Sequence, residues 1–376
     1  MPAAKPISKK PHVSPEADRL KTLRGLMNEH QIEAVLVSSP ANRRYYSGFE
    51  AWDYMIDESS GVLLITGRGQ HLLTDSRYTE AAKGEAPLFN IMTYRQGLGA
   101  ELARLNVLKK VKTIAFEPEF ISVAALDRIM EALPDHEFMD LPFSLDGPRS
   151  TKSPEEIKLV TKALAITEAA VGALWQKMVP GMTESEAAFF LESEFRRLGA
   201  EGPSFDTIVA SGPNAALPHA VPGAKKIKAG ETVVIDCGAK YRGYCADITR
   251  TKIMGPPQKW QREIYAIVKE AQNLAIAAIA PGVPANEVDK IARGYIAECG
   301  YGDYFGHGLG HGVGLVIHEA PSLSPRNSKD LQPGEIVTVE PGIYLPGKGG
   351  VRLEQLVLVT EKGYRLLNRN TDFYDF

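Results

Sequence analysis

The 376-residue sequence contains little cysteine and little histidine, and it has no long hydrophobic run. Three cysteines cannot build a disulfide framework, which excludes a small disulfide-stabilised scaffold and suits a reducing compartment. No stretch approaches the length of about 18 apolar residues that a membrane-spanning helix needs, and the first residues lack the apolar core of a signal peptide. We therefore expect a cytoplasmic protein that has no membrane partner.

A strong net charge is also missing. The formal charge is -3, which argues against nucleic acid as the main partner. With 44% hydrophobic and 24% charged residues, the composition is typical of a soluble globular protein. The chain is longer than the roughly 250 to 300 residues at which single cores stop growing, so we expect two domains.

Two acidic residues in the C-terminal half lie on a segment that is typical of a β-hairpin. In VVIDCGAKYRGYCADITRT, a turn centred between Tyr241 and Arg242 is predicted to place Asp236 directly across from Asp247. Cross-strand partners have Cβ atoms about 5 Å apart, so the pairing would bring two anions together. Such a pair is destabilising unless a cation compensates it.

A second acidic pair repeats the pattern. In VTVEPGIYLPGKGGVRLEQLVLV, a turn around Gly347 is predicted to oppose Glu340 and Glu354. A single Asp or Glu is usually a solvated surface charge, and that explanation is open for each acid alone. However, Asp236 and Glu340 both follow apolar runs, which places them at the ends of buried strands, where a carboxylate must be paired or bound to a metal.

The stretch GHGLGHGVGL adds His311, which brings the set to four carboxylates and one imidazole, a combination suited to divalent Mn, Co, Fe or Zn. Its glycines weaken a strand, so we interpret them as backbone that approaches a ligand closely. Cys237 and Cys245 flank the first acidic pair, but strand alternation turns them away from it and favours core packing.

The order Asp, Asp, His, Glu, Glu resembles the pita-bread metallopeptidases (peptidase family M24), which include Xaa-Pro aminopeptidase, prolidase and methionine aminopeptidase. The resemblance implies two metal ions, with manganese expected and cobalt, zinc or iron as alternatives. By this resemblance, Asp236 binds one ion, His311 and Glu340 hold the other, and Asp247 and Glu354 bridge both.

The same resemblance implies catalytic residues around the metals. His219 in NAALPHA matches the family's substrate-binding histidine, and His307 and His318 flank His311 in HGLGHGVGLVIHE. His307 has a structural explanation that is equally open. We expect two metals to bridge a water and present hydroxide to the scissile carbonyl, with Glu340 as the base. Arg352, two residues before Glu354, is expected to orient the carboxylates.

The predicted fold class is α+β, with a C-terminal pita-bread domain and a smaller N-terminal α/β domain. We expect a flexible tail at 1–13, the N-terminal domain at 14–147 and the catalytic domain at 148–376. Capping signals begin helices after Ser14, Ser153 and Thr183. Further predicted helices span 99–108, 122–133, 257–279 and 285–298, and predicted N-terminal strands span 34–37, 62–65, 71–74, 89–93 and 113–116.

The N-terminal half carries a weaker resemblance. ANRRYYSGFEAWDY and LLTDSRYTEAA are similar to segments of the smaller domain of Xaa-Pro peptidases, a domain that methionine aminopeptidases usually lack. The implied substrates are therefore peptides with proline in second position, and relatives are commonly homodimers. We interpret Tyr45, Tyr46, Trp52 and Tyr78 as core aromatics.

Other functions fit parts of this pattern. A creatinase-like hydrolase without metal and a binding protein on the same scaffold would both be expected to lose metal ligands, which are intact here. A metal-dependent lyase keeps them and is separated only by its products.

The choice between aminopeptidase and strict dipeptidase depends on HEAPSLSP. Several microbial prolidases that resemble this chain carry an arginine where Ser322 stands, and that arginine pairs with the carboxylate of a dipeptide's proline. A serine hydroxyl cannot supply such a clamp, although Arg326 is close in sequence. We therefore predict an Xaa-Pro aminopeptidase, with a strict Xaa-Pro dipeptidase (prolidase) as the alternative.

Overall fold

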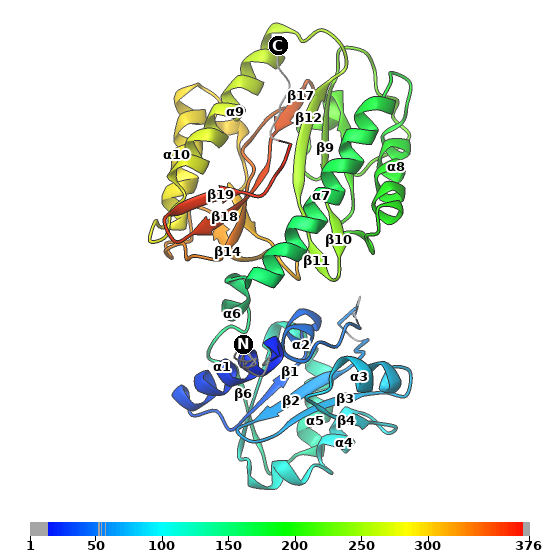
Figure 1. Cartoon of the computed structure of the whole chain (residues 1–376), viewed down its shortest axis with the longest axis vertical. Helices are drawn as coiled ribbons and strands as arrows, with labels where there is room; N and C mark the ends of the chain where they lie inside the picture. The colour runs from blue at the N-terminus through cyan, green and yellow to red at the C-terminus, as the bar shows by residue number, and fades with distance from the viewer. Residues whose placement is uncertain (1–13, 52, 54, 57, 371–376) are drawn as a thin grey trace, which may run out of the picture. The chain divides into compact units, whose positions relative to one another are not determined.

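The structure is a computed structural model in which residues 14–51, 53, 55–56 and 58–370 are described (Figure 1). The predicted tail at 1–13 and the predicted core residue Trp52 lie outside the described residues. The chain divides into two compact units, Met1–Pro148 and Arg149–Phe376. The described helices include none that is both long enough and apolar enough to cross a membrane.

The first unit is an α/β domain around one mixed sheet, within the described residues, with strand order β4-β3-β2-β1-β5-β6. The pairs β1–β5, β5–β6 and β3–β4 are parallel, and β1–β2 and β2–β3 are antiparallel. Its strands are β1 (Ala34–Val37), β2 (Val62–Thr66), β3 (Gln70–Thr74), β4 (Asn90–Thr93), β5 (Thr113–Phe116) and β6 (Glu137–Asp140).

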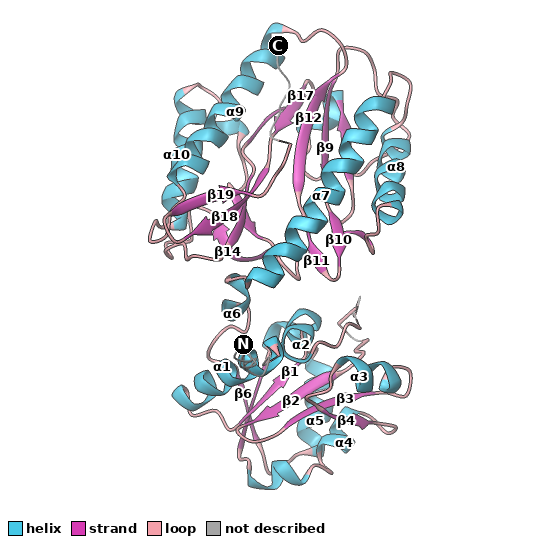
Figure 2. Cartoon of the chain, viewed as in Figure 1, coloured by secondary structure: helices cyan, strands magenta, loops and turns pink. Residues whose placement is uncertain are grey.

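The helices of this unit pack around that sheet, as the secondary-structure colouring shows (Figure 2). Ser14 caps the first helix and Pro15 occupies its first position, as predicted. Tyr45 and Tyr46 are buried, and Tyr78 is half-buried. The helices are α1 (Pro15–Glu29), α2 (Pro40–Ser47), α3 (Thr79–Glu85), α4 (Leu98–Leu102), η1 (Asn106–Lys110), η2 (Pro118–Phe120) and α5 (Val123–Ala132), followed by the short α6 (Gly147–Ser150).

The second unit has the expected α+β architecture, in which two helix pairs enclose the strands. In Figure 1, the green helices α7 (Pro154–Lys177) and α8 (Glu184–Arg197) lie on one side of the strands. The yellow helices α9 (Lys259–Ala278) and α10 (Ala285–Glu298) lie on the other. Both predicted capping boxes, Ser153 with Glu156 and Thr183 with Glu186, are formed. Each helix pair is followed by an acid-bearing hairpin, which fits the pattern of an internal duplication.

The strands between the helices form four small sheets within the described residues, with orders β11-β10-β7, β12-β9-β8, β14-β13-β15-β18-β19 and β16-β17. In the first half they are β7 (Gly202–Pro203), β8 (Ile208–Ser211), β9 (Thr232–Cys237), β10 (Ala239–Tyr241), β11 (Tyr244–Cys245) and β12 (Ile248–Ile253), with η3 (Gly212–Ala216) after β8. In the second half they are β13 (Gly310–Gly312), β14 (Glu319–Leu323), β15 (Ile336–Val339), β16 (Gly342–Leu345), β17 (Gly349–Arg352), β18 (Gln355–Thr360) and β19 (Gly363–Leu366), with η4 (Gly302–Tyr304) before β13.

The two halves of this unit meet along β12 and β17. The Thr251 hydroxyl donates to the Arg352 carbonyl, and the Glu354 backbone N–H donates to the Thr249 carbonyl. Behind β15 and β18, buried residues of α9 and α10 pack into one core, including Val268, Val337 and Val357. This packing fixes the strand ends that carry the acidic residues.

Candidate metal centre

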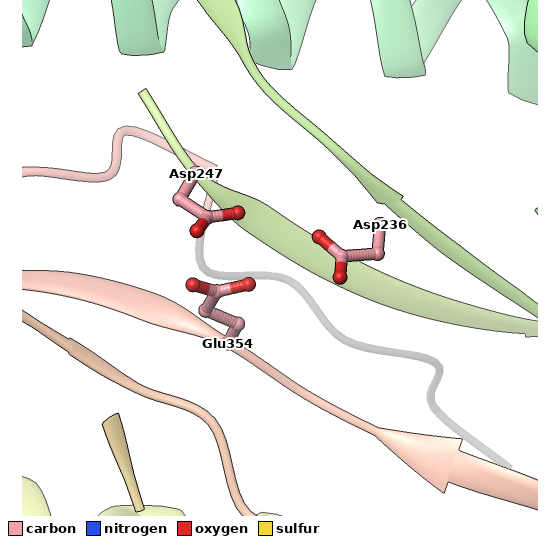
Figure 3. A group of neighbouring side chains, drawn as sticks. All are labelled: Asp236, Asp247 and Glu354. Carbon is pink, nitrogen blue, oxygen red and sulfur yellow. The ribbon is translucent and has the colours of Figure 1, made fainter. Parts of the chain in front are cut away.

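Three carboxylates from two different strand pairs point toward one another in the second unit (Figure 3). Asp236 lies in β9, Asp247 directly before β12, and Glu354 between β17 and β18. One oxygen of each lies within 4.8 Å of the others. The arrangement joins the two halves of the unit at a single point.

His311 and Glu340 complete the group. His311 lies in β13, and its Nε2 is 3.5 Å from Asp247 Oδ2 and 3.3 Å from Glu340 Oε1. Glu340 directly follows β15. The structure therefore brings together all five residues that the sequence suggested as metal ligands.

The register predicted for the second hairpin agrees with the structure on both sides of the acidic pair. Val339 pairs with Gln355 on one side, and Gly342 pairs with Arg352 on the other. The same register runs through Glu340 and Glu354, which lie where the pairing passes from one sheet to the next.

The register predicted for the first hairpin was wrong. Asp236 pairs with Thr249, not with Asp247, because the turn is centred between Arg242 and Gly243. These two residues have φ values of 46° and 77°, which is the conformation that a two-residue hairpin turn requires. Asp247 stands two residues from Thr249, on the same face, so the acids still approach each other diagonally.

The carboxylates are buried, but hydrogen bonds do not satisfy all of their oxygen atoms. Asp247 and Glu354 are 5% and 1% exposed. Among the described atoms, Asp236 Oδ1, Asp247 Oδ1 and Glu354 Oε1 are buried without a hydrogen-bond partner. A buried oxygen that accepts nothing costs free energy, whereas a divalent cation would satisfy all three at once. The donor set therefore fits metal ions.

Electrostatics point the same way. Burial and the neighbouring carboxylates raise the pKa values of Asp247 and Glu354 well above their ordinary range. Burial also acts to raise the pKa of Glu340, but His311 and Arg352 outweigh it and hold that pKa at about 2. The pKa of His311 is raised because Glu340 overcomes the effect of burial. Without metal, the site thus keeps protons on some ligands and charge on others.

Arg352 lies next to two of the carboxylates. Its Nη2 is 2.5 Å from Asp236 Oδ2, and its Nε lies 4.0 Å from Glu340 Oε2. It also donates to the hydroxyls of Thr249 and Tyr344. The side chain is 4% exposed, so this guanidinium acts as a fixed fork behind two of the carboxylates.

The three other histidines that the sequence suggested line the same cavity of about 780 Å³. His219 and His318 are exposed to it, and the His318 ring centroid is 4.3 Å from that of His311. His307 is half-buried, and its Nε2 is 2.8 Å from the Tyr344 hydroxyl. Burial lowers the pKa values of His307 and His318.

The interpretation of the glycines needs correction, because Gly310–Gly312 is a strand, β13. A Cβ on Gly310 would lie 2.0 Å from the Thr338 carbonyl oxygen, and one on Gly312 would lie 2.2 Å from that of Ala320. Gly310 and Gly312 lack side chains, which allows neighbouring backbone segments to approach closely. Gly308 and Gly310 also line the cavity. Cys237 and Cys245 are buried free thiols, as expected, and burial raises their pKa values.

Comparison with known proteins shows the family. Residues 158–361 match the model of metallopeptidase family M24, and residues 19–149 match the creatinase/prolidase N-terminal domain. This chain belongs to metallopeptidase family M24. Members of this family use divalent metal ions, and the fold expected from the sequence, a pita-bread domain behind a smaller N-terminal domain, is confirmed for this M24 peptidase.

Relatives of this M24 peptidase match over most of their length. The Xaa-Pro dipeptidase of Pyrococcus furiosus is 40% identical over 352 residues, which cover 94% of this chain and 98% of the relative. The solved Xaa-Pro dipeptidase from Bacillus anthracis is 38% identical, with a TM-score of 0.89 and coverage of 95% and 98%. The solved X-Pro aminopeptidase from Thermotoga maritima MSB8 is 40% identical, with a TM-score of 0.84 and coverage of 94% and 98%.

Sequence reasoning missed several residues of this M24 peptidase site. The Thr249 hydroxyl donates to Glu354 Oε2 at 2.9 Å and accepts from Arg352 Nε. Tyr344 links His307 to Arg352. Strand alternation was the available signal, because Thr249 lies two residues after Asp247 and Tyr344 four residues after Glu340.

Proposed function

We propose that this M24 peptidase hydrolyses the peptide bond before proline, using two divalent metal ions held by Asp236, Asp247, His311, Glu340 and Glu354. The observation that carries the proposal is the set of three buried carboxylate oxygens that accept no hydrogen bond within the described structure. Asp236 and Asp247 line one cavity with His311 and Glu340, and Glu354 lies within 4.8 Å of both aspartates, so the five residues offer a mixed oxygen and nitrogen donor set.

When bound, such ions would lower the pKa of a water molecule and polarise the scissile carbonyl. Glu340 accepts the proton of the attacking water. Arg352 keeps the Asp236 carboxylate in place through its hydrogen bond.

His219 and His318 bind the substrate. Both are exposed on the cavity wall, and neither is within ion-pair distance of the carboxylates in the described structure. They can donate hydrogen bonds to the substrate carbonyl and to the oxyanion that forms during hydrolysis. His307, held between the Gly308 carbonyl and the Tyr344 hydroxyl, acts from farther back.

The proposed substrates are Xaa-Pro dipeptides. Proteins named Xaa-Pro dipeptidase or prolidase recur among the relatives and neighbours of known structure, and this supports the dipeptidase alternative better than the aminopeptidase that we predicted first. The likeness extends over more than 90% of both chains, which supports the proposal that this chain, like those relatives, cleaves the Xaa-Pro bond.

An Xaa-Pro aminopeptidase is the second candidate, and the cavity lining favours it. Ser322, at the position of the clamping arginine, is exposed and does not line the cavity. Arg326 does not line it either, and among the described lining residues Arg352 is the sole lysine or arginine. Because Arg352 already pairs with Asp236, the described part of the cavity wall offers no uncommitted Lys or Arg for a dipeptide's carboxylate.

Two measurements test the proposal. Dialysis against a chelator should abolish hydrolysis of Ala-Pro, and Mn²⁺ should restore it; Asp247→Asn should bind less metal and stay inactive at matched Mn²⁺. Full activity in metal-free protein would refute the metal role. A higher kcat/KM for Ala-Pro than for Ala-Pro-Ala-Ala would support the dipeptidase, and the reverse order would support the aminopeptidase.

Manganese is the proposed ion, with cobalt, zinc and iron as alternatives, because mixed carboxylate and imidazole sites accept all four. A homodimer and a cytoplasmic location stay predictions. Light scattering of purified protein checks the first, and cell fractionation checks the second.

A further inference from the structure

The residue after His318 is Glu319, whose side chain is buried and has no part in the metal centre. His318 is exposed and lines the cavity, but the Glu319 side chain is 2% exposed and does not line it. The two neighbours in sequence therefore face opposite ways. Such alternation turns one side chain toward the substrate cavity and the other into the protein.

Two cations from the start of the second unit meet Glu319. Lys152 Nζ lies 2.7 Å from Glu319 Oε1, and Arg149 Nη2 lies 3.5 Å from Oε2. Lys152 is itself held in place, because its backbone N–H donates to the Gly334 carbonyl and its Nζ to the Ser150 carbonyl. The side chains of both cations are almost fully buried.

The Glu319 carboxylate also fills the inside of the loop that ends at His318. This loop joins β13 to β14. Glu319 Oε2 accepts the Val316 N–H at 3.4 Å, and a Cβ on Gly314 would lie 2.2 Å from Oε1. The Gly314 carbonyl in turn accepts the Cys245 N–H. One carboxylate thus connects the loop backbone to the segment before α7.

We propose that Glu319, held by Lys152 and Arg149, is the positioning residue that fixes His318 for the substrate. The inference rests on the proposed function, in which His318 binds the substrate. An ordinary stabilising role explains the contacts less well, because a buried ion pair is often no more stabilising than apolar residues of the same size. The ion pairs instead fix a position. The two cations hold the Glu319 carboxylate in one place, and that carboxylate holds the backbone of the loop next to His318.

Three single variants separate position from stability. Glu319→Gln keeps the shape and removes the charge, Lys152→Met removes the nearer cation but leaves Arg149, and Glu335→Gln is the matched control. Glu335 is a buried glutamate near Lys152 that binds the Gln332 N–H and makes no described contact with the loop.

Misplacing a catalytic group by about 1 Å can lower the rate on the order of a hundredfold, so we expect kcat on Ala-Pro to fall about ten- to a hundredfold in Glu319→Gln and Lys152→Met. Glu335→Gln should keep the kcat of the wild type. All three variants should bind as much metal as the wild type.

A double-mutant cycle with His318→Ala supplies the decisive readout. If Glu319 acts through His318, Glu319→Gln should change kcat by less than about twofold in the His318→Ala background. An equal fold loss in both backgrounds would overturn the proposal, because a general structural role does not depend on His318. Wild-type kcat in both Glu319→Gln and Lys152→Met would overturn it as well.

Hydrogen exchange tests the same inference without activity. In metal-free protein, amides of residues 312–318 should exchange faster in Glu319→Gln and Lys152→Met than in Glu335→Gln, and unchanged exchange would reject the positioning role. If the wild-type protein cleaves no Xaa-Pro peptide, the proposed function fails while this measurement still decides whether Glu319 holds the loop.

Discussion

At the metal centre, protons and metal ions compete for the same carboxylate oxygens. Asp247 and Glu354 have raised pKa values in the metal-free protein because they are buried beside other carboxylates. Above the ordinary carboxyl pKa of about 4, the folded protein therefore holds protons that the unfolded chain has lost. Metal binding must displace those protons, so metal affinity and metal-free stability respond to pH in opposite directions.

The expected outcome is that metal-free protein loses stability as pH rises from 5 to 8. At Asp247 and Glu354 the native state binds more protons in this window than the unfolded state, so their contribution to the free energy of unfolding falls with increasing pH. His311, whose pKa is also raised, adds to the loss. The lowered pKa values of His307 and His318 oppose it up to the ordinary histidine pKa of about 6.5, and Glu340, with a pKa of about 2, opposes it only below this window. Thermal melts of wild-type protein and Asp247→Asn at each pH check the prediction.

Asp247→Asn should be more stable than the wild type in metal-free buffer, by about 2–4 °C at neutral pH, because the amide needs no proton when it is buried on folding. With saturating Mn²⁺ the order should reverse. A wild-type protein whose metal-free melting temperature rises steadily to pH 8 would contradict the assignment of protons to this site.

The histidines are expected to separate into two classes. His311→Ala should reduce bound metal, because His311 Nε2 lies among the carboxylates. His219→Ala and His318→Ala should keep about two metal ions per chain but lower kcat by roughly a hundredfold, since general acid–base and oxyanion contacts are each worth about that much. Metal analysis and kinetics on one preparation of each variant check this, and equal metal loss in all three would show that the roles are misassigned.

At the scale of elements, local signals predicted helices and their starts well. The capping boxes at Ser153 and Thr183 form because each pairs a hydroxyl with a glutamate three residues later, an interaction within one turn. The helix predicted at 99–108 is instead α4 and η1, broken at Leu105, whose backbone is extended. The strand β6 was not predicted, since its sequence EFMD is short, polar and mostly exposed at a sheet edge.

Contacts between segments that are distant in the chain could not be predicted from the sequence alone. The turn at Arg242 and Gly243 set a register two residues away from the predicted one, and only positive φ values distinguish the two. Glu319 was missed because its partners, Lys152 and Arg149, lie more than 160 residues earlier in the chain. The four acidic residues were found because they form pairs on predicted hairpins, and His311 was added from its glycine-rich stretch, whereas the division of the five ligands between two metal ions came from the resemblance to a family.

The strand β13 provides a test of close packing. Gly312→Ala should lower stability by about 1–3 kcal/mol or more, because its Cβ would lie 2.2 Å from the Ala320 carbonyl oxygen and the backbone would have to shift. The shift should also move the adjacent His311 and weaken metal binding. Gly306→Ala is the matched control, since no atom lies within 4 Å of its Cβ position. Denaturant melts and metal titrations check both, and equal effects of the two variants would contradict the packing argument.

At the scale of the whole molecule, two compact units with separate cores share one chain. The described core of the first unit includes Leu36, Leu64 and Ile114, and all five proposed ligands belong to the second unit. A ligand that binds only one folded unit stabilises that unit. Metal and stability are therefore coupled in one part of the molecule and not in the other.

Calorimetry should resolve two unfolding transitions, of which only one depends on metal. At about 100 times the dissociation constant, bound metal adds about 2.7 kcal/mol, which corresponds to a rise of roughly 5–10 °C for a unit of this size. The other transition should stay where it is, and Asp247→Asn should show no shift in either. A single transition that moves as a whole would mean that the two units unfold together.

The unsatisfied oxygens also determine which ion the isolated protein carries. Asp236, Asp247 and Glu354 present hard donors beside one imidazole, and nothing in that set discriminates sharply among first-row divalent ions. Affinity in such sites follows the general order of the metals, with nickel, copper and zinc ahead of manganese. Protein taken from a nickel column or a zinc-rich medium will therefore carry those ions, and its metal content will record the ions it met during isolation, not the ion with which it works in the cell.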